Sequence, residues 1–127
     1  MKNQIIDIEG LRRLSGNDEA FIAEILKLYT DQAAKDVIEL ENSSALDDWN
    51  TIRFVVHRMR SSAVPLGLKD LVVLLKKVEM KLKDGIHENV HSEIVRIIEI
   101  SRYAIADAKH QLSLKVHNFL PLTNGKT

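Results

Sequence analysis

Residues 48–67, DWNTIRFVVHRMRSSAVPLG, carry the pattern from which the rest of the chain is interpreted. Placed on a helix at about 100° per residue, the apolar and small side chains of this stretch fall on one core-facing stripe. The members of the stripe are Ile52, Val55, Val56, Met59, Ser62 and Ala63. His57 lies about 150° from the centre of the stripe, so we expect its imidazole to point into water. Pro65 and Gly67 are expected to end the helix.

Two arginines, two apolar side chains and one serine surround His57 on the helix projection. Arg53, Phe54, Arg60, Ser61 and Val64 fall within about 60° of His57 on the helix projection. An unperturbed imidazole has a pKa of about 6.5 and is therefore largely neutral and nucleophilic in neutral solution. The spacing thus predicts an exposed nucleophile between two guanidinium groups. The alternative is an ordinary solvated surface histidine.

Residues 57–63, HRMRSSA, followed by Gly67 and Leu71, resemble the motif of histidine-containing phosphotransfer (HPt) domains. That family reads His-x-Leu-Lys-Gly-x-Ser or Ala, with a second glycine and a leucine beyond. Methionine and arginine replace the usual leucine and lysine, and Ser61 stands where the family normally has glycine. Residues 11–21 and 74–79 are also similar to flanking segments of the family.

The resemblance implies a phosphoryl carrier. His57 would accept a phosphoryl group from receiver-domain aspartates of a two-component phosphorelay and return it to them. Such a carrier has no kinase activity and needs no cofactor, because the magnesium belongs to its partner. Arg60 is expected to neutralise phosphoryl oxygens, and Arg53 is a second candidate whose alternative is a solvated charge. Ser61 either crowds the receiver domain or donates a hydrogen bond to the phosphoryl group.

A docking surface is expected beside the histidine. Phe54 and Val64 lie off the core stripe, and apolar side chains left on a surface often mark an interface. We expect Ile8 and Leu11 to extend this surface and Lys76 to add positive charge near it. Scattered surface hydrophobes and a solvated lysine are the alternatives.

The remaining periodicity predicts further amphipathic helices. A short helix follows Asp7 and ends at Gly16, and Asn17 is expected to cap a helix of about 25 residues. Asp47 is expected to cap the helix that carries His57, and the last two helices flank residues 84–85, Asp-Gly.

Together these elements predict one all-α domain. We expect an antiparallel up-down four-helix bundle with a short additional N-terminal helix over residues 1–117. Residues 1–6 are expected to form a loose arm and residues 118–127 a flexible C-terminal tail.

Charge balance, the lack of cysteine and the lengths of the apolar runs exclude several classes of function. The 127 residues carry 18 basic and 18 acidic side chains, so the basic excess typical of nucleic-acid binders is missing. There is no cysteine, and no apolar run has the length of a signal peptide or a membrane span. We therefore expect a soluble, cytoplasmic monomer that binds neither nucleic acid nor membrane.

Other functions remain open. His87-Glu88-Asn89-Val90-His91 matches the His-Glu-x-x-His motif of zinc peptidases, with His110 as a candidate third ligand of a zinc-dependent hydrolase. Another possibility is a non-catalytic helical interaction module in which His57 has no chemical role. The phospho-acceptor hairpin of a sensor kinase fits less well. That segment usually has Glu directly after the histidine and then Arg-Thr-Pro, whereas Arg58 follows His57 here.

Overall fold

The computed structural model describes residues 5–119, with side chains as far as residue 114. Its elements are α1 (Ile8–Ser15), α2 (Glu19–Ala45), α3 (Trp49–Ala63), the 3₁₀ helix η1 (Val64–Leu66), α4 (Lys69–Lys83) and α5 (Val90–Phe119). None of the described residues forms a β-strand. The predicted all-α class is confirmed.

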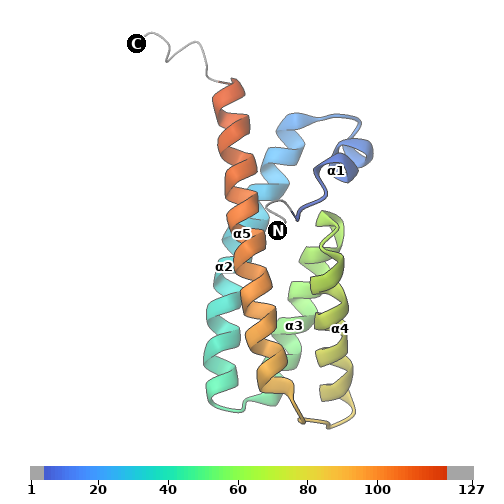
Figure 1. Cartoon of the computed structure of the whole chain (residues 1–127), viewed down its shortest axis with the longest axis vertical. Helices are drawn as coiled ribbons and strands as arrows, with labels where there is room; N and C mark the ends of the chain where they lie inside the picture. Colours follow the sequence, from blue (N-terminus) through green and yellow to red (C-terminus); the bar gives the residue numbers. More distant parts are fainter. Residues whose placement is uncertain (1–4, 120–127) are drawn as a thin grey trace.

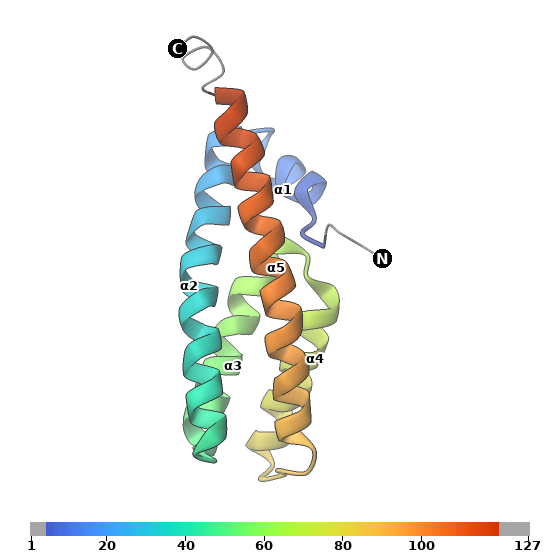
Figure 2. The same cartoon turned by 60° about the vertical axis from the view of Figure 1, so that its left-hand side comes forward.

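The four longer helices enclose one core (Figure 1). α2 packs against α3 and α5, and α4 packs against the same two helices, so each of the four longer helices has two neighbours among the other three. α2 and α5 extend beyond the α3–α4 pair, and α1 lies next to η1 at the end of that pair (Figure 2).

Burial of α3 follows the stripe predicted from its sequence. Ile52, Val55, Val56 and Ala63 are 0% exposed and Met59 is 5% exposed. Burying one large apolar side chain contributes roughly 1.5–3 kcal/mol, so this face alone strongly favours one rotation of the helix. Ser62, at the edge of the stripe, is half-buried.

Two helices begin one residue later than predicted. The side chain of Asp18, rather than Asn17, accepts a hydrogen bond from the backbone N–H of Phe21, and Asp48, rather than Asp47, does the same for Thr51. Asn17 and Asp47 instead adopt left-handed backbone angles, with φ of 65° and 54°. Periodicity locates a helix but does not identify its first residue when two capping residues are adjacent.

Residues 5–6 and 118–119 differ from the predicted loose segments, and residues 1–4 lie outside the described part of the chain. The backbone N–H groups of Ile5 and Ile6 both donate to Oδ2 of the buried Asp107, at 2.9 Å, so these residues are held against α5. α5 continues through Asn118 and Phe119, and the rest of the predicted tail lies outside the described residues. No helix within the described part of the chain is both long and apolar enough to cross a membrane.

The turn after α3 depends on a glycine. Gly67 has φ of +66°, and its N–H donates to the carbonyl of Val64 at 3.1 Å. The backbone N–H of Asp7 donates to the carbonyl of Leu66 at 2.9 Å, which brings the start of α1 against this turn. A Cβ atom on Gly67 would lie only 2.7 Å from Cβ of Asp7. Position 67 therefore requires glycine for two reasons: its positive φ and the close approach of the Asp7 side chain.

Gly67→Ala should destabilise the protein more than Gly85→Ala. Gly85 has a similar φ of +71°, but a Cβ atom added there would have no neighbour within 4 Å, so it reports the cost of the backbone angle alone. We expect about 1 kcal/mol for Gly85→Ala and about 1–3 kcal/mol more for Gly67→Ala. Chemical denaturation of both variants measures the difference. Equal losses would contradict the proposed contact with Asp7.

Candidate functional site

The imidazole of His57 reaches water from the middle of α3. Its side chain is 57% exposed, as its position opposite the core stripe predicts. A rigid helix therefore presents the ring at the surface, where a second protein could approach it.

A carboxylate on α4 holds one edge of this ring. Nδ1 of His57 lies 2.6 Å from Oε2 of Glu79. The other carboxylate oxygen, Oε1, accepts hydrogen bonds from Nε and Nη2 of Arg60 at 3.0 and 2.9 Å. Glu79 is only 17% exposed, so one half-buried carboxylate joins the two site residues on α3 across the α3–α4 contact.

The charge of Glu79 decides which ring nitrogen of His57 carries the proton. Partial burial opposes ionisation, but hydrogen bonds from His57 and Arg60 outweigh it and hold the pKa of Glu79 below its ordinary value. A carboxylate can only accept hydrogen bonds, so Nδ1 of His57 must carry the proton that it donates. In the neutral ring the lone pair is then on Nε2, the nitrogen away from Glu79.

An open depression of about 400 Å³ adjoins the ring. It is lined by Asn50, Arg53, Phe54, His57 and Glu79, so α3 supplies most of its wall. Arg53 forms no ion pair with any side chain that the structure describes, and its guanidinium is exposed. The depression thus combines the histidine, a cation without an internal partner and an aromatic ring.

Only two of the four apolar residues predicted for the docking surface are exposed. Phe54, on α3, and Val64, the first residue of η1, are 64% and 56% exposed. Ile8 and Leu11 are only 5% and 4% exposed, because the apolar face of α1 packs into the core. These two residues are therefore core residues and offer almost no surface to a partner.

The position of Lys76 remains compatible with its expected role. It is exposed on α4, one turn before Glu79, and forms no ion pair with the described residues.

Ser61 is also exposed. Its hydroxyl makes a long hydrogen bond, 3.4 Å, to the carbonyl of His57 on the preceding turn. This bond is longer than an ordinary O–H···O hydrogen bond and is therefore weak. The hydroxymethyl group adds bulk on the turn after His57.

Two acidic residues that organise this surface were not predicted. Glu79 is described above, and Asp36 of α2, whose side chain is 1% exposed, accepts hydrogen bonds from Nε and Nη2 of Arg58. The guanidinium of Arg58 lies 5.4 Å from the ring centroid of Phe54, close enough for a cation–π contact. Asp36 therefore holds Arg58 in place beside the ring of Phe54.

A signal for both acids exists in the sequence. Each interrupts an apolar stripe at helical spacing: Asp36 lies between Ala33, Val37 and Leu40, and Glu79 lies among Leu75, Val78 and Leu82. A carboxylate at a stripe position must find donors when the helices pack, because its burial is otherwise costly.

The zinc-motif residues have other partners. His87 precedes α5 and stacks on Trp49, with ring centroids 4.1 Å apart. His91, on α5, places Nε2 2.8 Å from Oδ1 of Asp47 and Nδ1 2.9 Å from the Ser44 hydroxyl. The two histidines therefore do not share one helix, and they join the α4–α5 turn to the α2–α3 turn.

The proposed third zinc ligand lies too far away. His110 is on the same helix as His91, 19 positions later. At 1.5 Å per residue the two are about 28 Å apart along α5, so they cannot bind one ion. Among the described residues there is no group of three or more acidic, histidine or cysteine side chains suited to a metal.

Comparisons with known protein families, with curated proteins and with solved structures found no match. The function must therefore be inferred from the residues and geometry of the site.

Glu79→Gln should lower stability more at neutral pH than in acid. The folded-state pKa of Glu79 is below its ordinary value of 4.5, so the ionised carboxylate stabilises the fold above that pH and loses this effect as the pH falls through its lower folded-state value. We expect the variant to lose about 1 kcal/mol near pH 7 and to show a smaller deficit near pH 3.

Urea unfolding at the two pH values measures this difference. Glu24→Gln, an exposed carboxylate on α2, is the matched control and should leave stability unchanged at both. A Glu79→Gln deficit of the same size at both pH values would show that the carboxylate charge is not responsible.

Proposed function

We propose that this protein is a histidine phosphotransfer carrier that exchanges a phosphoryl group on His57 with receiver-domain aspartates of a two-component phosphorelay. The observation that carries the proposal is the exposed ring of His57 with Nδ1 held by Glu79, 2.6 Å away. This arrangement leaves Nε2 as an oriented nucleophile. This geometry supports the same function as the resemblance of residues 57–63 to the HPt motif, and it does so on physical grounds.

The transfer step needs no proton movement. Nε2 of the neutral ring attacks the phosphorus of an aspartyl phosphate in line with the bond that breaks. A nitrogen–phosphorus bond forms, the phosphorus–oxygen bond to the aspartate breaks, and the carboxylate leaves with the electron pair. The ring keeps its Nδ1 proton and becomes positively charged, and the carboxylate of Glu79 stabilises that charge. Donation to the next receiver domain is the reverse reaction.

Two arginines are suited to the phosphoryl oxygens. Glu79 accepts from Nε and Nη2 of Arg60, which leaves Nη1 without a hydrogen bond to any described residue. Arg53 lines the depression beside His57. Its exposed guanidinium can neutralise incoming negative charge without first breaking an internal ion pair.

The proposed partner surface surrounds the histidine. Phe54 and Val64 provide the apolar contact with the receiver domain, and Lys76 contributes positive charge at its edge. In this proposal the four longer helices form an antiparallel up-down four-helix bundle, with α1 as its short additional helix, and the carrier works in the cytoplasm.

His57→Gln should abolish phosphoryl transfer. Incubated with a phosphorylated receiver domain, the wild type should acquire a label that is stable in base and labile in acid, and His57→Gln should acquire none. The reason is that Nε2 of His57 is the only proposed attachment point. Autoradiography after gel electrophoresis, with acid and base treatment, measures the label.

His87→Gln and His110→Gln are the controls, since both retain the His57 site. They should be labelled like the wild type. Labelling that persists in His57→Gln would reject His57 as the attachment point. A wild type that acquires no label would reject phosphoryl transfer and leave a helical interaction module as the explanation.

Ser61→Gly should accelerate transfer. Removing the hydroxymethyl group opens space beside His57, while glycine within a helix costs about 1 kcal/mol of stability. We expect the rate from a phosphorylated receiver domain to rise several-fold, measured by rapid quench. Ser61→Ala is the matched variant: it keeps Cβ and should remain close to the wild type. Equal rates for serine and glycine would remove steric hindrance as an effect of this residue.

A further inference from the structure

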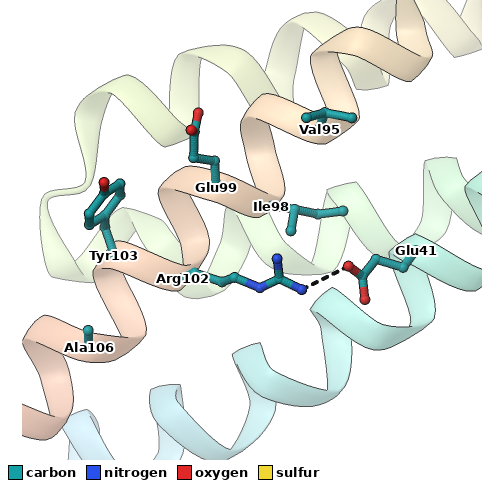
Figure 3. A pocket seen from close by; sticks show the side chains of 7 residues that line it. All are labelled: Glu41, Val95, Ile98, Glu99, Arg102, Tyr103 and Ala106. Carbon is teal, nitrogen blue, oxygen red and sulfur yellow. Dashed lines mark hydrogen bonds and ion pairs between the residues drawn. The ribbon is translucent and has the colours of Figure 1, made fainter.

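A second surface lies between α2 and α5. A groove of about 600 Å³ is lined by residues of both helices, with Glu41 on the α2 side (Figure 3). Along its α5 side, Val95 and Tyr103 are 66% and 64% exposed, and Ala106 is exposed as well. We call this surface the α5 groove. Exposed apolar side chains that gather beside a groove often mark an interaction site.

One ridge of α5 has a pattern that is symmetric about its midpoint. Val95, Glu99, Arg102 and Ala106 are spaced by four, three and four residues, so they form one row along the helix. The row reads apolar, acidic, basic, apolar. In an antiparallel pair of such ridges related by a two-fold axis between Glu99 and Arg102, each Glu99 faces the Arg102 of the other copy. Val95 then faces the small Ala106.

The two charged residues retain unused hydrogen-bonding groups. Arg102 donates through Nη2 to Glu41 at 2.8 Å, and Glu99 accepts through Oε1 from Arg96 at 2.8 Å. The remaining guanidinium N–H groups of Arg102 and Oε2 of Glu99 make no hydrogen bond with the described residues. A second copy would supply partners for both without breaking an existing ion pair.

We propose that the α5 groove binds a second copy of this chain through an antiparallel α5–α5 contact. The two-fold axis passes between Glu99 and Arg102. The chain has no net charge, so two copies experience little general repulsion. The ridge from Val95 to Ala106 is about 17 Å long, which makes a small contact and a weak dimer, with a dissociation constant on the order of tens of micromolar. The monomer expected from the sequence is then the dissociated form.

This contact is independent of the proposed phosphoryl transfer. α2 packs against α5 and α3 packs against α4, so the α5 groove lies across the helical core from the seam that holds His57 and Glu79. Both copies in the dimer keep His57 accessible. Dimerisation and phosphoryl transfer can therefore be tested separately.

Charge reversal tests the pairing. Glu99→Arg places arginine opposite arginine across the two-fold axis, and Arg102→Glu places glutamate opposite glutamate. We expect each variant alone to dimerise at least about tenfold more weakly than the wild type. Mixed in equal amounts, the two variants become complementary and should form a heterodimer about as tightly as the wild type pairs with itself.

Sedimentation velocity over a concentration series that brackets the expected dissociation constant measures association. Thermal unfolding verifies that each variant is folded, and Glu99→Arg leaves the Glu41–Arg102 ion pair intact. Lys69→Glu, an exposed charge reversal at the start of α4, is the control and should dimerise like the wild type. A wild type that stays monomeric throughout the series, which would leave the groove to a different protein, overturns the proposal. So does a dimer that both single variants retain, or a mixture that does not associate.

Discussion

Four side chains of α3, Ile52, Val55, Val56 and Ala63, are completely removed from water, and this burial sets the rotation of the helix. Turning α3 by one residue, about 100°, would expose that face and cost several kcal/mol. The same rotation that buries the stripe presents His57, Phe54 and Ser61 outward. The exposure of the candidate nucleophile is therefore a consequence of core packing.

Glu79 fixes the position of α4 relative to α3 and the orientation of the His57 ring. A carboxylate at a core-stripe position of α4 loses hydration when the helices pack, and this cost is offset only if donors meet it. Arg60 and the Nδ1–H of His57 meet it from α3. The resulting contact restricts how α3 and α4 can slide past each other. It also selects the tautomer of His57 that leaves Nε2 available, so a structural requirement and a chemical one are satisfied by the same group.

A similar arrangement occurs on the other side of α3. Asp36 interrupts the stripe of α2 and binds Arg58, which in turn lies over the ring of Phe54. The site thus has an acid on each neighbouring helix, one supporting the histidine and the other supporting the proposed docking side chain. Asp47, the partner of His91, joins the turn between α2 and α3 to α5, so this histidine of the zinc-peptidase motif makes a structural contact.

The sequence by itself determined the helices, the buried face of α3 and the outward direction of His57, because these depend on spacing within one segment. The caps of α2 and α3 were misplaced by one residue, since adjacent capping residues compete locally and the turn geometry decides between them. Only the tertiary structure placed Ile8 and Leu11 in the core, joined His91 to Asp47, and brought Glu79 to His57 and Arg60. Those outcomes depend on which helix faces which, and residues 22 positions apart in the chain meet only after the cores of α3 and α4 have packed together.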